Sequence, residues 1–118
     1  MAKQYIVSGY RYGDQPDNIY PEVRSSSTEA VNLAIDKVVD FLESIGAIEN
    51  SRVLLRNLEP EGVIGDAIAE LAADKCATDS VDLDVFRLML KNKQTPSFFV
   101  QDRNTNRWID CLVTKVTI

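Results

Sequence analysis

This 118-residue chain contains no histidine, and that absence excludes more chemistry than any other feature of its composition. Histidine is the commonest general base and the commonest metal ligand in proteins. Cys76 and Cys111 alone cannot complete a four-ligand zinc site. Serine or cysteine hydrolysis through a histidine partner is likewise excluded. We therefore expect no metal, no cofactor and no catalytic residues of these kinds, and the sequence favours a protein that is not an enzyme.

The chain also lacks long apolar runs. Its first residues, MAKQYIVSGY, have no long apolar stretch of the kind found in signal peptides, and no run approaches membrane-spanning length. Both cysteines lie in apolar contexts, which favours buried free thiols over a disulfide framework. From these features we predict a cytoplasmic protein with no membrane contact.

Charge is unevenly distributed along the chain, whose net charge is −5. Residues 29–84 hold thirteen acids and four bases, a net charge of −9, whereas residues 85–118 hold six bases and two acids, a net charge of +4. The overall acidity argues against a nucleic-acid partner, because affinity for a phosphate backbone depends on concentrated positive charge. The asymmetry suggests either a solvated acidic helical face or complementary charge for a protein partner.

The length corresponds to one globular domain covering residues 1–118. Residues 4–12 (QYIVSGYRY) are rich in aromatic and β-branched side chains and predict a first strand. Residues 13–26 contain turn-forming residues throughout and predict a long irregular connection. A capping pair, Ser26 and Glu29, and a periodic apolar stripe predict a helix over residues 28–45, ended by Gly46.

The middle of the chain leaves one alternative open. Residues 51–58 (SRVLLRNL) fit a short buried strand or a helical turn. A second helix is predicted from Pro60, because proline suits a first helical turn, and a third from near Asp82. Residues 97–102 and 107–117 predict a hairpin joined by residues 103–106, with Asn106 in a left-handed conformation.

These elements, in the order β-α-β-α-α-β-β, predict an α+β two-layer sandwich. In it, a small mixed sheet packs against helices on one face. Sheet order and oligomeric state do not follow from the sequence.

Two segments are candidates for a binding surface. One is the first strand and the connection after it, and the other is the tip of the final hairpin. Successive side chains on a strand point to opposite faces, so Arg107 and Trp108 point opposite ways. Either Trp108 anchors the core while the arginines are solvated, or the arginines meet an anion or an acidic partner. The candidate binding residues are Tyr10, Arg11, Tyr12, Tyr20, Arg24, Arg103, Arg107 and Trp108.

Two functions are favoured by these observations, and an enzyme that relies on Asp, Glu, Tyr, Lys or Cys alone is a third, less favoured alternative. In the first, the chain is a small non-enzymatic interaction protein of bacterial or phage type, which binds a protein partner or assembles into a homo-oligomer. In the second, it binds a small anion or nucleotide through arginine and aromatic side chains. Replacing Arg103 and Arg107 with alanine should abolish binding only in the second case.

Overall fold

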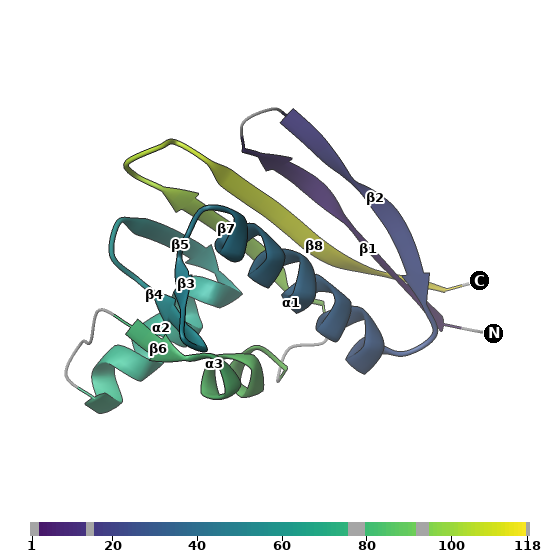
Figure 1. The fold of residues 1–118 in the computed structure, drawn as a ribbon. Helices are drawn as coiled ribbons and strands as arrows, with labels where there is room; N and C mark the ends of the chain where they lie inside the picture. Colours follow the sequence, from purple (N-terminus) through teal and green to yellow (C-terminus); the bar gives the residue numbers. More distant parts are fainter. Residues whose placement is uncertain (1–2, 14–15, 76–79, 92–94, 118) are drawn as a thin grey trace.

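The computed structural model describes residues 3–13, 16–75, 80–91 and 95–117. Its elements follow one another along the chain (Figure 1) as β1 (Lys3–Tyr12), β2 (Pro16–Arg24), α1 (Ser27–Ser44), β3 (Ile48–Glu49), β4 (Arg52–Leu54), β5 (Leu58–Gly62), α2 (Val63–Lys75), β6 (Ser80–Asp82), α3 (Leu83–Leu90), β7 (Ser97–Asp102) and β8 (Trp108–Thr117).

The strands form two sheets. A five-stranded sheet has the order β2-β1-β8-β7-β5, and a three-stranded sheet has the order β3-β4-β6. The predicted α+β class is confirmed. All the described strand pairs are antiparallel, so two antiparallel sheets replace the expected mixed sheet. In three of these pairs, β1 with β2, β3 with β4 and β7 with β8, a short connection joins consecutive strands, which excludes a parallel pair because that needs a long crossover.

The predicted irregular connection over residues 13–26 is wrong. Most of it is β2, which pairs with β1 along nearly its whole length. The segment contains Pro16 and Pro21, and proline is tolerated in a strand at the edge of a sheet, where one side needs no hydrogen bonds. The turn-forming residues of this segment therefore led to a wrong prediction of a connection where the chain forms an edge strand.

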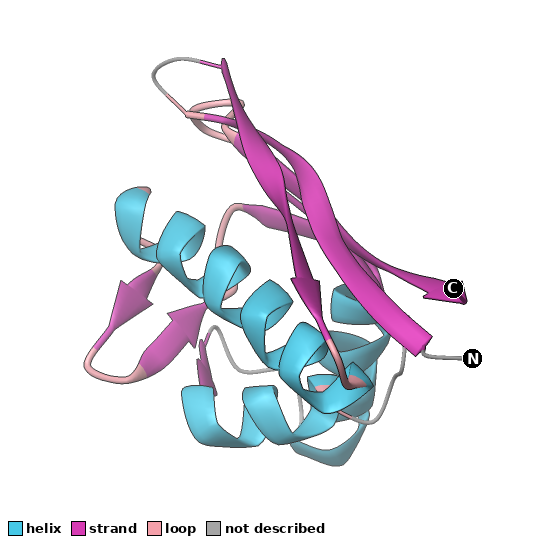
Figure 2. Ribbon diagram, turned by 90° about the vertical axis from the view of Figure 1, so that its right-hand side faces the viewer, coloured by secondary structure: helices cyan, strands magenta, loops and turns pink. Residues whose placement is uncertain are grey.

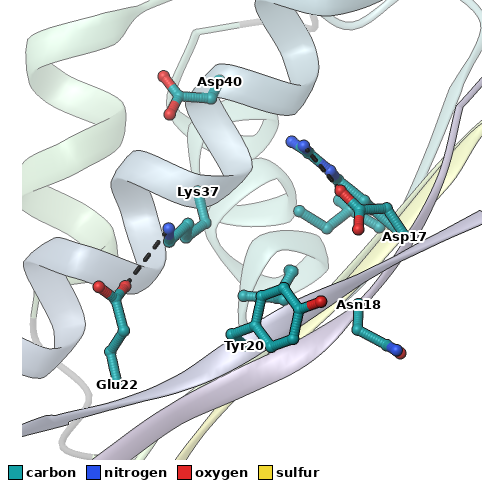
Figure 3. Close-up of a pocket in the computed structure, with 9 residues that line it drawn as sticks. Asp17, Asn18, Tyr20, Glu22, Lys37 and Asp40 are labelled. Atoms are coloured by element: carbon teal, nitrogen blue, oxygen red, sulfur yellow. Dashed lines mark hydrogen bonds and ion pairs between the residues drawn. The ribbon is translucent and has the colours of Figure 1, made fainter.

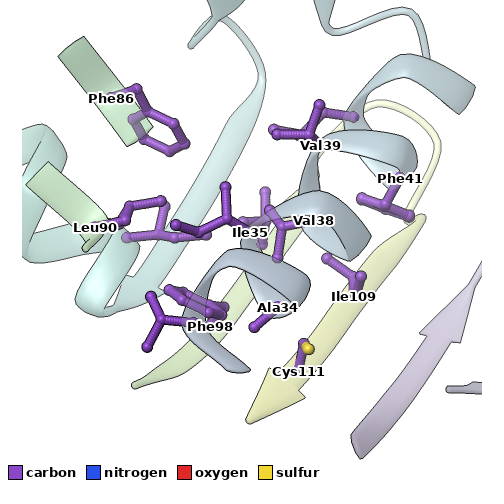
Figure 4. Packing of buried hydrophobic residues seen from close by; sticks show 14 of the residues in the cluster. Ala34, Ile35, Val38, Val39, Phe41, Phe86, Leu90, Phe98, Ile109 and Cys111 are labelled. Carbon is purple, nitrogen blue, oxygen red and sulfur yellow. The ribbon is translucent and has the colours of Figure 1, made fainter. Parts of the chain in front are cut away.

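The long helix was predicted correctly to within a residue at each end. Ser26 is its N-cap and accepts a hydrogen bond from the backbone N–H of Glu29, and Gly46 follows its end at φ 74°. The helix lies across one face of the five-stranded sheet. Its apolar stripe packs on the strands with Phe86 and Leu90 of α3 beside it (Figure 4). The buried residues of α1 are Ala30, Val31, Ala34, Ile35, Val38, Val39, Phe41 and Leu42.

The middle of the chain corrects one prediction and settles another. Residues 52–54 form strand β4, so the strand alternative for residues 51–58 holds. This strand pairs within the small sheet. The second helix begins at Val63, because Pro60 belongs to β5, the other edge strand of the large sheet. The third helix is confirmed, with Asp82 accepting hydrogen bonds from the N–H groups of Asp84 and Val85.

The final hairpin is confirmed, and Asn106 has φ 58° in its turn. Figure 2 shows α1 and the small sheet on one side of the five-stranded sheet, and no described element lies across its other side. We call that other side the open face. None of the described helices is both long enough and apolar enough to cross a membrane.

Candidate interaction surface

Strand alternation divides β8 between two environments. Ile109, Cys111 and Val113 are buried beneath α1, whereas Trp108, Asp110 and Leu112 lie on the open face. The idea that Trp108 anchors the helix-covered core is therefore wrong. Its neighbour Ile109 takes that position, because the register of β8 turns Ile109 toward α1.

Pairing of the strands brings aromatic rings together on the open face. In β1, Tyr12 lies opposite Trp108 and Tyr10 lies opposite Asp110. On the other side of β8, Phe99 of β7 also lies opposite Asp110. The centroid of the Trp108 ring system lies 5.3 Å from that of Tyr10, 6.5 Å from that of Tyr12 and 6.1 Å from that of Phe99. These separations fall in the range in which aromatic rings attract one another.

We call this cluster of Tyr10, Tyr12, Phe99 and Trp108 the aromatic face. Tyr10, Phe99 and Trp108 are half-buried, and Tyr12 is 39% exposed. Leu112 of β8 and Val23 of β2 extend the apolar surface on the same side, at 36% and 49% exposure. Exposed apolar side chains that gather on one face mark interaction sites more often than singly scattered ones do.

The charges on the open face are acidic. Asp110 lies between Tyr10 and Phe99 in the cross-strand row. In β5, Glu59 lies opposite Gln101 and Glu61 lies opposite Phe99, so both occupy positions of the open face. Glu59 and Glu61 make the β5 edge of this side acidic, and Asp110 adds a negative charge among the rings.

The structure places Arg11 and Arg24 on the opposite side of the sheet from Tyr10, Tyr12 and Trp108. Arg11 is on the helix-covered side, where its guanidinium lies 3.1 Å from a carboxylate oxygen of Asp17. Arg24 lies opposite Tyr5, also on the helix-covered side, and donates a hydrogen bond to the carbonyl of Val23.

Arg103, one of the two arginines of the hairpin tip, has its described partners outside the ring cluster. Arg103 lies at the corner of the sheet, with its Nε 3.4 Å from a carboxylate oxygen of Glu59, and it donates to the carbonyl of Leu58. Arg107 precedes Trp108 and is half-buried.

Tyr20 belongs to a second feature, a groove of about 400 Å³ between β2 and α1 (Figure 3). The groove contains two ion pairs, Arg11 with Asp17 and Lys37 with Glu22, the latter 3.3 Å apart. Each of these bases already faces a carboxylate, and a third carboxylate, Asp40, also lines the groove, so the groove offers no uncompensated positive charge to an anion.

The one described cysteine is not available for chemistry. Burial, and then the nearby Asp110 carboxylate, raise the pKa of the Cys111 thiol to about 12. The thiol is fully buried beneath α1, which confirms the expectation for this residue, whereas Cys76 lies outside the described residues. Among the residues the structure describes, no group of three or more acidic or cysteine side chains could hold a metal ion.

Sequence reasoning identified Tyr10, Tyr12 and Trp108 but missed Phe99 and Asp110. Alternation within the hairpin does place Phe99 and Trp108 on a common face once the turn is known. Gln101 lies opposite Trp108, and Phe99 is two residues from Gln101 on the same strand, so all three side chains point to one face. No local signal showed that β1 would pair with β8 and bring its tyrosines beside them.

No protein-family model matches this sequence, and comparisons with curated proteins and with solved structures also find no match, so the surface is interpreted from its geometry.

Proposed function

We propose that this is a small non-enzymatic interaction protein that binds a protein partner through its aromatic face. The observation that carries the proposal is the position of Tyr10, Tyr12, Phe99 and Trp108 on the open face. Tryptophan and tyrosine are enriched among the residues that dominate binding energy at protein interfaces.

The face of the sheet is better suited to binding than its edges. Both edge strands contain proline, Pro21 in β2 and Pro60 in β5, and proline removes a backbone donor. Such residues hinder the addition of another strand at an edge. A partner therefore meets side chains rather than backbone.

The open face supports a protein partner more than a small anion. Arg11 and Arg103 are paired with carboxylates, and Arg24 lies on the helix-covered side. The rings instead surround Asp110, which would repel a phosphate. Anion or nucleotide binding therefore has less support from this arrangement.

The absence of histidine and the raised pKa of the buried Cys111 thiol support the non-enzymatic part of the proposal. A free, buried thiol also suits the reducing cytosol, which we propose as the compartment.

Site-specific photo-crosslinking in the cells that make the protein tests the proposal. A photoreactive phenylalanine at position 12 replaces a tyrosine of the aromatic face. The matched control carries the same group at position 20, where Tyr20 is 77% exposed but lines the groove instead. We expect a discrete higher-mass adduct from position 12 alone.

The mass of the adduct identifies the partner class. An adduct of twice the chain mass would indicate a second copy, and any other discrete mass would indicate a different protein. Equal adducts from both positions, or none from position 12, would contradict the proposal.

A further inference from the structure

We infer that the aromatic face receives a basic side chain of the partner, an arginine or a lysine, with Asp110 as its counter-ion. This inference rests on the proposed function and specifies the chemistry of the partner. It depends on the rings, the carboxylate among them and the distribution of charge over the sheet.

The rings provide the first element of a cation site. A cationic group is attracted to the face of an aromatic ring, most strongly to tryptophan. Trp108 lies within 6.5 Å of three other rings, so a side chain that enters this cluster meets more than one π-system at once. An arginine also stacks its planar guanidinium on such surfaces.

Asp110 provides the second element. It lies directly opposite Tyr10 on one side and Phe99 on the other, and it is two residues from Trp108 on the same face. The carboxylate is half-buried by these neighbours, and the structure records no ion pair for it among the residues that it describes. A charge-assisted hydrogen bond to such a carboxylate is stronger than a neutral one.

The surrounding charges favour the same partner. Glu59 and Glu61 lie on the open face at β5, whereas Arg11, Arg24 and Lys115 lie at register positions of the helix-covered side. Arg103, at the corner of the sheet, brings a positive charge to the acidic edge, where it pairs with Glu59. A positively charged segment is therefore complementary to this side of the sheet.

The same charges disfavour a second copy as the occupant. A symmetric face-to-face dimer places a surface patch against its own copy. It would bring two copies of Asp110 and Glu61 toward one another across an interface. Like charges placed together in this way destabilise a complex.

Short basic peptides provide the test, with Trp108 as the reporter, because it is the only tryptophan in the chain. The probe is acetylated tri-arginine amide. The neutral control is the tri-citrulline peptide, which keeps the shape of arginine but removes its charge. Tryptophan fluorescence is followed at constant ionic strength. We expect a saturable change with tri-arginine and none with tri-citrulline.

Two variants with the same change in net charge locate the site. Asp110→Asn removes the carboxylate among the rings, whereas Asp40→Asn removes an exposed carboxylate from α1. We expect Asp110→Asn to weaken binding about tenfold, the effect of losing one charged hydrogen bond. Asp40→Asn should weaken it by less than about twofold, as expected for a distant surface charge.

A second variant, Tyr10→Leu, keeps an apolar side chain but removes a ring, and it should also weaken binding. It keeps the test informative if Asp110→Asn fails to fold, which circular dichroism would reveal. Equal weakening by Asp110→Asn and Asp40→Asn, equal binding of the citrulline peptide, or no saturation at millimolar tri-arginine would overturn the inference. Crosslinking at position 12 would still show a partner if only this inference fails, and its loss would identify failure of the proposed function.

Discussion

The ring centroids of Trp108 and Tyr10 lie 5.3 Å apart on the side of the sheet that α1 leaves open. The two residues are separated by almost the whole chain and meet because β1 pairs with β8 over ten residue pairs. Antiparallel cross-strand aromatic pairs of this kind add stability to the sheet. The same pair therefore stabilises the fold and forms the surface that we propose for binding.

Neighbouring positions on β8 should differ in their effect on stability. Ile109→Ala removes a fully buried side chain and should lower the free energy of unfolding by about 2–5 kcal/mol. Trp108→Ala removes a larger but half-buried side chain and should lower it by less, about 1–2 kcal/mol, because water rather than an empty cavity replaces the lost ring. Urea denaturation of both variants measures the difference. A greater loss for Trp108→Ala would mean that Trp108 anchors the core after all.

Gly9 allows β1 and β8 to approach each other. A Cβ atom at this position would lie 2.0 Å from the backbone oxygen of Asp110 and 2.9 Å from the Cα atom of Cys111. Gly9→Ala should therefore destabilise the protein by about 3 kcal/mol or more, since the backbone itself must move.

Gly13→Ala is the matched control, because a Cβ atom there meets nothing within 4 Å. Its effect should be within about 0.5 kcal/mol. Thermal unfolding followed by circular dichroism compares the two variants, and similar melting temperatures would contradict the close approach.

Asp102 stabilises the turn between β7 and β8 through hydrogen bonds of its side chain. Its buried carboxylate accepts a hydrogen bond from the backbone N–H of Asn104 at 3.1 Å and another from the hydroxyl of Thr105 at 2.8 Å. Asp102→Ala should lower the free energy of unfolding by about 1–3 kcal/mol, because these donors lose their acceptor. Thr105→Val should lower it by about 0.5–1.5 kcal/mol.

Asp17→Ala is the comparison for Asp102→Ala. Asp17 forms an exposed ion pair with Arg11, and its loss should lower stability by less than about 1 kcal/mol. Guanidinium denaturation of the variants gives the ranking, and equal losses for Asp17 and Asp102 would show that the turn contacts contribute nothing specific.

The Cys111 thiol should make stability depend on pH. Its pKa is raised to about 12 in the folded protein from an ordinary value of 9.0. The stability that this group contributes is therefore fully present below pH 9.0 and is lost as pH rises toward 12. The free energy of unfolding, measured by urea denaturation below and above pH 9.0, should fall more with rising pH for the wild-type chain than for Cys111→Ala. Parallel pH dependence in both proteins would contradict the burial of this thiol.

The same thiol should resist modification. In a Cys76→Ala background, a thiol-specific reagent should leave native Cys111 unreacted and modify it only on unfolding, because the thiolate is the reactive form. Rapid reaction of the native protein would indicate that β8 opens beneath α1.

Some elements follow directly from local sequence. The Ser26 cap and the apolar period of α1, the strand character of β1 and the turn that contains Asn106 all depend on residues close together in the chain. The same local patterns predicted a connection where β2 lies and a start of α2 at Pro60 instead of Val63. The prolines of both segments lie in edge strands, and only the neighbouring strand shows whether an extended segment is paired.

By itself the sequence determined that the chain lacks histidine chemistry, that it contains α1 and the final hairpin, and that Trp108 and Ile109 point to opposite faces. It could not determine which of those two faces would be covered, because each carries apolar residues of strand type. The packing of α1 on Ile109, Cys111 and Val113, together with the pairing of β1 with β8, determines which face of β8 is covered. These contacts join residues far apart in the chain, so only the tertiary structure places Tyr10, Phe99 and Asp110 around Trp108.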